Sequence, residues 1–223
     1  NRGEAARWVR ALGIGGTAVG TGINAEPQYP ALMVKHLRDI TGLELEVGED
    51  RVQLMQSMGD IAGFSGALRA WVLDLNKIAN DIRLLASGPR TGLAEIGLPA
   101  VQPGSSIMPG KVNPSIAEMV NQVCYQALGL DVTVAMAAEA GQLELNVMMP
   151  VMTHNIVFAL MIVGNATRVF AERCDAYAAQ LGYRANTAAR SLRTRSSALI
   201  GFRVPHLNEV FSQRAERLSN ELR

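Results

Sequence analysis

The chain has 223 residues, a formal net charge of +1, 48% hydrophobic residues and only 5% aromatic residues. This length suits one large domain or two small ones, and a core of small aliphatic side chains favours packed helices over a β-sandwich or barrel. The near-neutral charge argues against nucleic-acid binding as the main role. We also expect no membrane span, because no charge-free apolar run reaches about 18 residues.

The cysteine and histidine positions predict neither a metal site nor a cofactor site. Cys124 and Cys174 are the only cysteines, and the three histidines are scattered along the chain. Two cysteines without a recognisable signal peptide fit a reducing cytosol, so we expect a cytoplasmic protein. The first residue is Asn1 rather than methionine, which suggests that upstream sequence is missing.

The first third of the chain predicts two helices joined by a glycine-rich connection. Apolar spacing indicates a helix over residues 1–12. The segment Gly13–Asn24 carries five glycines and suits a tight connection where backbones approach closely. Its Gly20-x-Gly22 spacing is only a weak nucleotide-loop signal, since no βαβ pattern surrounds it. A second helix is expected after Pro30, with Gly42 as its stop.

A long helix is predicted from Glu49 to Ser87, about 57 Å in length at 1.5 Å per residue. A helix this long implies packing in a bundle or across subunits. The glycines Gly59, Gly63 and Gly66 within it would allow a close approach by another helix.

The remaining pattern is also helical, over residues 116–130, 132–146 and 151–173, with Pro150 expected to bend the path. Ser115 and Glu118 have the spacing of a helix capping box. Arg90 suits a helix C-terminal charge or an intersubunit ion pair better than a carboxylate clamp. With no alternating strand pattern of useful length, the fold class is predicted to be an all-α bundle.

Residues 104–114 read Gly-Ser-Ser-Ile-Met-Pro-Gly-Lys-Val-Asn-Pro and carry the clearest functional signal. Ser105 and Ser106 supply hydroxyls, Lys111 a positive charge, and Asn113 an amide, all of which suit an anionic substrate. The glycines and prolines would let backbone N–H groups approach a ligand. The alternative is an ordinary solvated connection between helices.

Four stretches together resemble the class II fumarase/aspartase superfamily: 16–24, 77–83, 87–90 and 104–114. The resemblance covers about residues 10–174 and implies the central long-helix domain of that fold. It also implies a homotetramer with a twenty-helix core, whose active sites are shared between subunits. Members eliminate water, ammonia or a larger amine from a succinyl skeleton and leave fumarate, so the implied substrate is a small dicarboxylate or amino acid.

The resemblance also implies roles for single residues. Ser105 would be the catalytic base, and Ser106, Lys111 and Asn113 would bind a substrate carboxylate. Glu118 would support the site by orienting a histidine from another segment, although helix capping alone would explain it.

The sequence around 123–126 and 137–146 looks more like aspartate ammonia-lyases than fumarate hydratases. We therefore expect an ammonia-lyase or a fragment of one. A fumarate hydratase or a catalytically silent structural fragment remain the alternatives. The predicted domains are a central bundle over 1–174, with the family's N-terminal domain absent, and an Arg-rich segment over 175–223 that does not match the family.

Overall fold

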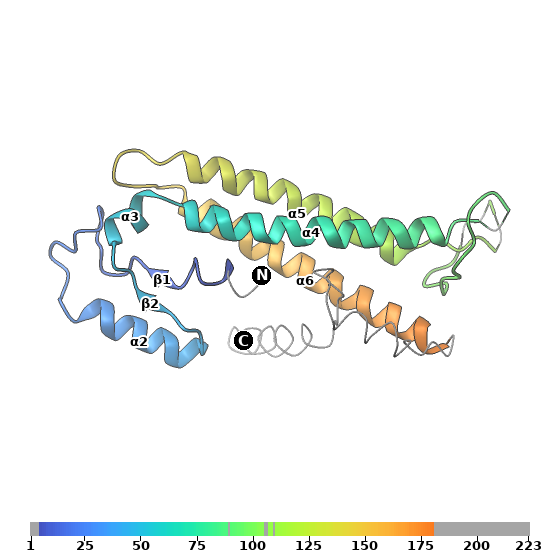
Figure 1. Ribbon diagram of the computed structural model, residues 1–223, viewed down its shortest axis with the longest axis horizontal. Coiled ribbons are helices and arrows are strands. Elements are labelled where there is room, and N and C mark those ends of the chain that lie inside the picture. The colour runs from blue at the N-terminus through green and yellow to red at the C-terminus, as the bar shows by residue number, and fades with distance from the viewer. Residues whose placement is uncertain (1–4, 89, 105–106, 109, 181–223) are drawn as a thin grey trace, which may run out of the picture. The chain divides into compact units, whose positions relative to one another are not determined.

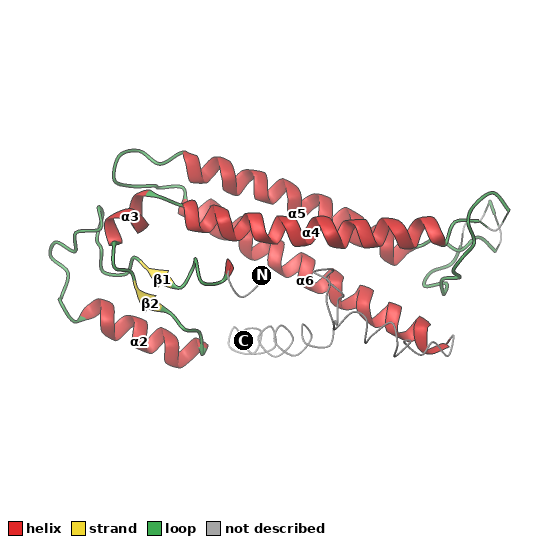
Figure 2. Cartoon of the chain, in the orientation of Figure 1, coloured by secondary structure: helices red, strands yellow, loops and turns green. Residues whose placement is uncertain are grey.

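The computed structural model describes residues 5–88, 90–104, 107–108 and 110–180, the last four by their backbone only (Figure 1). In chain order the elements are β1 (Ala11–Leu12), α2 (Tyr29–Thr41), β2 (Glu46–Val47), α3 (Arg51–Gln56), α4 (Gly59–Leu85), α5 (Ser115–Glu139) and α6 (Met149–Gln180). Helices dominate the described residues (Figure 2). The all-α prediction is confirmed, and the two short strands are its one exception.

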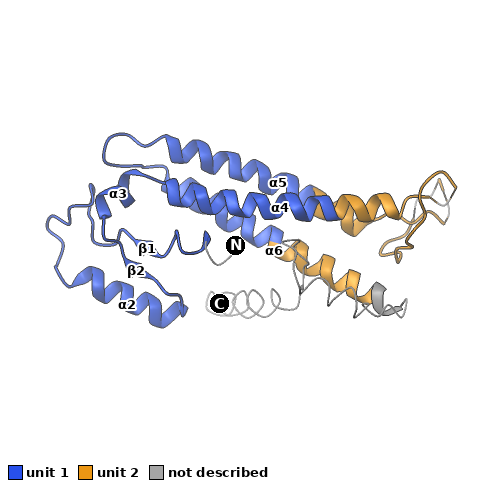
Figure 3. Ribbon diagram, viewed as in Figure 1, with its two compact units in different colours: residues 1–78, 122–163 blue, residues 79–121, 164–223 orange. Residues whose placement is uncertain are grey.

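The chain divides into two compact units (Figure 3). Unit 1 comprises residues 1–78 and 122–163, and unit 2 comprises residues 79–121 and 164–223. Helices α4 and α6 therefore begin in unit 1 and end in unit 2, whereas α5 begins in unit 2. The candidate site lies in unit 2, and the N-terminal elements lie in unit 1.

The predicted helix over residues 1–12 is wrong for its described part. Residues 6–9 form turns, and Ala11–Leu12 pairs in parallel with Glu46–Val47. The backbone donors of Glu46 and Gly48 reach the carbonyl oxygens of Arg10 and Leu12, both at 3.0 Å. These bonds from a distant segment replace the local helical bonds that the apolar spacing favours.

The glycine-rich connection is confirmed at Gly20. Its φ angle is +88°, and a Cβ atom there would lie 2.4 Å from the backbone of Val52. Only glycine accommodates both the left-handed backbone and this approach. Gly42 also ends α2 as predicted, in the left-handed conformation with its N–H bonded to the Arg38 carbonyl at 2.8 Å.

The single helix predicted over 49–87 is interrupted. Asp50 caps α3 by accepting from the Gln53 N–H at 2.9 Å, and Ser57 then adopts an extended conformation before α4 begins. The next residue, Met58, is buried in a cluster with Val134, Ala137 and Met152. Burial of Met58 against α5 and α6 stabilises this break in the predicted helix. The sequence has no proline or glycine pair there that would predict it.

Three helices form the core of unit 1. The buried cluster at Met58 is joined by Ile61 of α4 and Ile156 of α6. Farther along α4, Ser65 donates to the buried Asp131 carboxylate at 2.6 Å, and Arg69 pairs with it at 2.8 Å. This polar contact fixes how α4 and α5 align, because a buried carboxylate needs its donors.

The segment between α5 and α6 differs from the predicted helices. α5 continues through Asp131 to Glu139, and residues 140–148 are not helical. Asn146 is fully buried there and donates to the Ala137 and Ala138 carbonyls at 3.0 and 3.1 Å. Pro150 lies in the first turn of α6 rather than at a bend, since the missing N–H of proline costs nothing there.

Within α6, Met149–Ala176 is long and apolar enough to cross a membrane by length and composition alone. The most apolar window has a mean hydropathy of 1.4, and 28% of it is buried. A window of this kind tolerates up to two charged residues, whereas the expectation of no membrane span rested on runs without any charge. A core helix of a soluble protein meets the same criterion, so the finding is weak evidence for a membrane span.

Candidate active site around residues 104–114

The candidate site is the connection between α4 and α5, and it begins by folding back onto the end of α4. The Leu85 carbonyl accepts from the N–H groups of Glu95 and Ile96 at 2.9 and 3.3 Å. The Ser87 hydroxyl accepts from the Leu93 N–H at 3.1 Å and donates to the Leu84 carbonyl at 2.6 Å. These bonds satisfy carbonyls that the last helical turn leaves without partners.

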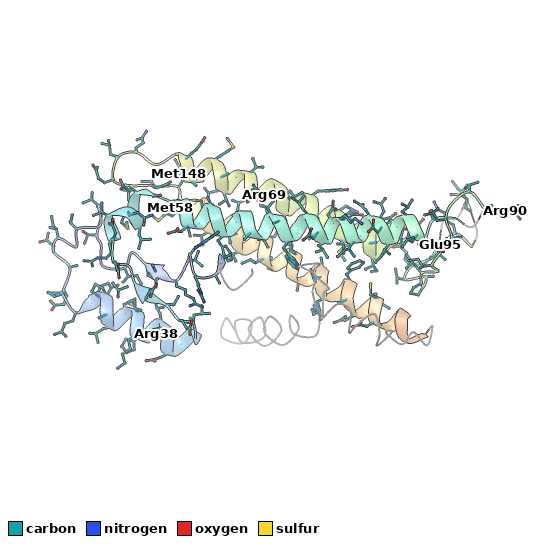
Figure 4. All side chains as sticks on the ribbon, in the orientation of Figure 1. Arg38, Met58, Arg69, Arg90, Glu95 and Met148 are labelled. Atoms are coloured by element: carbon teal, nitrogen blue, oxygen red, sulfur yellow. The ribbon has the colours of Figure 1, made fainter. Side chains whose placement is uncertain are left out.

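Arg90 and Glu95 lie on this connection, beyond the end of α4 (Figure 4). Arg90 is exposed. Its predicted role, a helix-end charge or an intersubunit ion pair, stays a prediction.

The other end of the connection is fixed at the start of α5. The Glu118 N–H donates to the Pro114 carbonyl at 3.0 Å, and the Ser115 hydroxyl accepts from the Gln102 side chain at 2.8 Å. The capping box would have the Ser115 hydroxyl accept from the Glu118 N–H, and it stays a prediction. Through Gln102, Ser115 links the helix start to the incoming chain.

The segment 104–114 closes on itself between those ends. A Cβ atom on Gly104 would lie 2.4 Å from the Lys111 carbonyl oxygen, so the two backbones touch where only glycine fits. The Lys111 N–H donates to the Met108 carbonyl at 3.1 Å, and Gly110 between them has a φ angle of +84°. The Lys111 backbone is therefore held from both sides.

The structure describes three of the five predicted site residues. Lys111 is exposed, and Asn113 and Glu118 are half-buried. Lys111 and Asn113 lie on the segment and Glu118 on the first turn of α5. Ser105 and Ser106 lie outside the described residues.

Two further residues support this connection, and neither was predicted to have a role. Arg83, near the end of α4, donates to the side-chain oxygen of Asn121 on α5 at 3.0 Å, and Asn121 is 2% exposed. This bond holds together the two helix ends that carry the segment. Arg83 belongs to residues 77–83, one of the four stretches that resemble the superfamily, and that was the only sequence signal for a role of Arg83. The sequence gave no signal for Gln102.

A pocket of about 210 Å³ lies beside the segment in unit 2. Asn113 and Ser115 contribute to one part of its wall and Arg173 to another, while the rest is mainly apolar. Its lining residues are Ile82, Ile96, Leu98, Pro99, Val101, Asn113, Pro114, Ser115, Ile116, Ala117, Phe170, Arg173 and Cys174. Lys111 does not line it, so the pocket and the predicted anion-binding charge are separate features.

Both cysteines favour the neutral thiol. Burial raises the pKa of the Cys124 thiol to about 11. Partial burial of the Cys174 thiol and then the charge of Asp175 raise the pKa of that thiol, although the residue as a whole is exposed to solvent. Neither thiol therefore has the lowered pKa of a nucleophile. Among the described residues, no group of three or more His, Cys, Asp or Glu side chains could hold a metal ion.

Comparison with known proteins shows the family to which the chain is similar. Residues 4–129 match the family described as lyase. An aspartate ammonia-lyase of Helicobacter pylori is 48% identical over 171 residues, which are 77% of this chain and 36% of that protein. The corresponding enzyme of Pseudomonas fluorescens is 45% identical over 211 residues, 94% of this chain and 43% of that protein. That match is long enough to reach into residues 175–223, and the predicted division at 174 stays a prediction.

Solved structures agree with these matches. A fumarate lyase:delta crystallin of Brucella melitensis bound to cobalt has a TM-score of 0.73 and 52% identity, over 77% of this chain and 37% of that one. A class II fumarase of Schistosoma mansoni has a TM-score of 0.69 and 34% identity, over 77% and 40%. The chain spans about a third of the first curated relatives, 36% and 34% of their lengths. Since the family match covers more than half of the chain and includes the whole 104–114 segment, the chain belongs to the lyase family, and the resemblance to the fumarase/aspartase superfamily is confirmed.

Proposed function

We propose that this chain is part of a carbon–nitrogen lyase that converts L-aspartate to fumarate and ammonia. The observation that carries the proposal is the identity of 45–52% to several aspartate ammonia-lyases. The chain itself spans only part of such an enzyme, so the activity is proposed for the protein that contains it.

The chemistry needs a base and a site for extra negative charge. Ser105 takes the proton from the carbon beside the β-carboxylate, and the electron pair moves into that carboxylate to form a dianionic aci-carboxylate. The pair then returns to form the carbon–carbon double bond as the carbon–nitrogen bond breaks, and ammonia leaves. A neutral serine hydroxyl is too weak a base for this step, so Ser105 must react as its alkoxide. Nearby hydrogen-bond donors and positive charge are needed to stabilise that alkoxide.

Lys111, Asn113 and Ser106 are proposed to bind the substrate carboxylate. The exposed ammonium of Lys111 supplies a charge that grows in importance as the dianion forms, and such preorganised groups are worth about 10²–10³ in rate. Asn113 adds a donor on the same segment. Glu118 is proposed to orient a histidine from another segment.

A fumarate hydratase that acts on malate is the second candidate. The observation in its favour is the likeness to the class II fumarase of Schistosoma mansoni at 34% identity. A silent fragment is the third, because the chain spans about a third of its relatives.

We also propose a homotetramer with shared active sites, in the cytoplasm. Support for association with another subunit comes from α5, where Tyr125, Val132 and Met136 are 56%, 57% and 63% exposed. Their spacing of seven and four residues places them on one side of the helix. Exposed apolar side chains on one side of a helix suit packing against another subunit.

The proposal is tested by following fumarate formation by its ultraviolet absorbance, for this chain and for the full protein that contains it. Fumarate from aspartate supports the ammonia-lyase, fumarate from malate supports the hydratase, and no fumarate from either supports a silent protein. Ser105→Ala is expected to lower the rate about 10²–10⁴-fold, as loss of a general base does.

The charge is tested separately by Lys111→Met, which should cost about 10²–10³ in rate. Lys35→Met is the matched control, because Lys35 is another exposed lysine and lies on α2. Full activity in Ser105→Ala would overturn the assignment of the base. Equal rates in the two lysine variants would overturn the role of Lys111.

A further inference from the structure

The side chain of Gln102 bridges the two ends of the 104–114 segment. Its amide nitrogen donates to the Ser115 hydroxyl oxygen at 2.8 Å across 13 residues of chain. The Ser115 hydroxyl lies 3.5 Å from the Asn113 carbonyl oxygen, to which it donates. A short chain of hydrogen bonds thus runs from Gln102, before the segment, to the backbone of Asn113 within it.

A second contact lies just inside the first. The backbone of Gly104, two residues after Gln102, touches the carbonyl oxygen of Lys111. Lys111 therefore takes part in one cross-link and Asn113 lies between the two, and both cross-links come from residues 102–104. Because Gln102 is only two residues before Gly104, holding Gln102 against Ser115 restricts where Gly104 can lie.

The bond between Gln102 and Ser115 is exposed, which limits what it can do for the fold. An exposed hydrogen bond contributes only about 0.5–1.5 kcal/mol. That amount cannot hold a domain together, yet it changes the population of one local arrangement by a factor of about 2–12, at 1.4 kcal/mol for each factor of ten. The effect should therefore be confined to the segment.

We propose that Gln102 is a positioning residue, which acts through Ser115 to hold Lys111 and Asn113 in their substrate-binding arrangement. The link to a substrate rests on the proposed function, whereas the ordering of the segment does not. Gln102 itself does not contact substrate. Losing its bond lowers the fraction of molecules with a competent segment, which weakens apparent substrate binding by the same factor.

The experiment measures amide hydrogen exchange over Lys111 to Asn113, by mass spectrometry, together with kcat and KM for fumarate formation. The variants are Gln102→Ala, Ser115→Ala and the double variant. Ser115→Thr keeps the hydroxyl and is the conservative rescue. Gln126→Ala removes an exposed glutamine from α5 and is the matched control.

We expect each alanine variant to speed exchange over Lys111–Asn113 about 2- to 12-fold, the range set by the worth of one hydrogen bond. The double variant should exchange no faster than Ser115→Ala, because the bond that Gln102→Ala removes is already lost when Ser115 is replaced. Ser115→Thr and Gln126→Ala should exchange like the parent. KM for the dicarboxylate should rise by a smaller factor than exchange, because a segment that is mostly ordered loses only a small part of its competent fraction. The kcat should be nearly unchanged.

Unchanged exchange in Gln102→Ala would overturn the proposal, whatever the activity. A fall in kcat without faster exchange would also overturn it, since Gln102 would then act on the substrate directly. Faster exchange in a protein that forms no fumarate from any substrate would support the ordering role of Gln102 and overturn the proposed lyase function.

Discussion

Asn146 offers the sharpest test of how residues 140–148 are held. Its side chain is fully buried, donates to the Ala137 and Ala138 carbonyls, and accepts from the Met148 N–H at 2.8 Å. Its own N–H donates to the Met55 carbonyl at 2.9 Å. One side-chain amide therefore satisfies carbonyls at the end of α5 and the N–H of the residue directly before α6.

Asn146→Ala removes all three side-chain bonds and leaves their partners in place. A buried partner left unpaired costs about 1–3 kcal/mol. Ala137 is buried, whereas Ala138 and Met148 are partly accessible to water. We therefore expect the free energy of unfolding to fall by about 2–4 kcal/mol in total.

Asn146→Asp should be worse than Asn146→Ala at neutral pH. The carboxylate would still accept from the Met148 N–H. Its second, negatively charged oxygen, however, would face the Ala137 and Ala138 carbonyl oxygens, which lie 3.0 and 3.1 Å from the amide nitrogen of Asn146. Burial and these carbonyls raise the pKa of the introduced carboxyl. Part of the lost stability should return as the pH falls through that pKa, because the protonated carboxyl can donate again.

Urea unfolding followed by circular dichroism measures these differences. With a slope of about 2 kcal/mol per molar urea, Asn146→Ala should lower the midpoint by about 1–2 M. Glu144→Gln, an exposed change in the same connection, should stay within about 0.5 kcal/mol of the parent. A midpoint for Asn146→Ala equal to that of Glu144→Gln would refute the reasoning. An Asn146→Asp variant no less stable than Asn146→Ala at neutral pH would refute the assigned orientation of the amide.

Four further outcomes are expected. Gly20→Ala should lower the free energy of unfolding by at least 1–3 kcal/mol, about the strain of a left-handed non-glycine residue, since its Cβ would also meet the Val52 backbone; an unchanged urea midpoint would contradict this. Ser65→Ala should cost about 1–3 kcal/mol because the buried Asp131 carboxylate loses a donor, and thermal unfolding without a fall in midpoint would show that the bond contributes little. A thiol reagent at neutral pH should label the exposed Cys174 and leave the buried Cys124 unlabelled until urea is added. Burial raises the pKa of Cys124 from 9.0 to about 11 in the folded protein. The stability that the neutral thiol contributes is therefore complete below pH 9 and is lost as the pH rises through about 11. Urea unfolding across that pH range would detect the fall in the free energy of unfolding.

The site was only partly predictable from the sequence. The types and order of residues in 104–114 indicated an anionic substrate and the family, and the family is confirmed. The cross-links that hold this segment were not predictable, since neither a glutamine in a loop nor an arginine on a helical surface has a pattern that identifies its partner. Gln102 reaches Ser115 and Arg83 reaches Asn121 only because α4 and α5 bring them together.

Local sequence determined the features whose causes are themselves local. Apolar spacing indicated most of the helices, and Gly42 stopped α2 because glycine readily takes the left-handed conformation. Only the tertiary structure decided where a helix ends because groups from distant parts of the chain replace its own hydrogen bonds. The chain leaves the helix at Ser57 beside the buried Met58, and α5 ends before residues 140–148, where Asn146 takes over its last carbonyls. Helix propensity differs by less than about 1 kcal/mol between ordinary residues, so a few buried contacts from far along the chain are enough to override it.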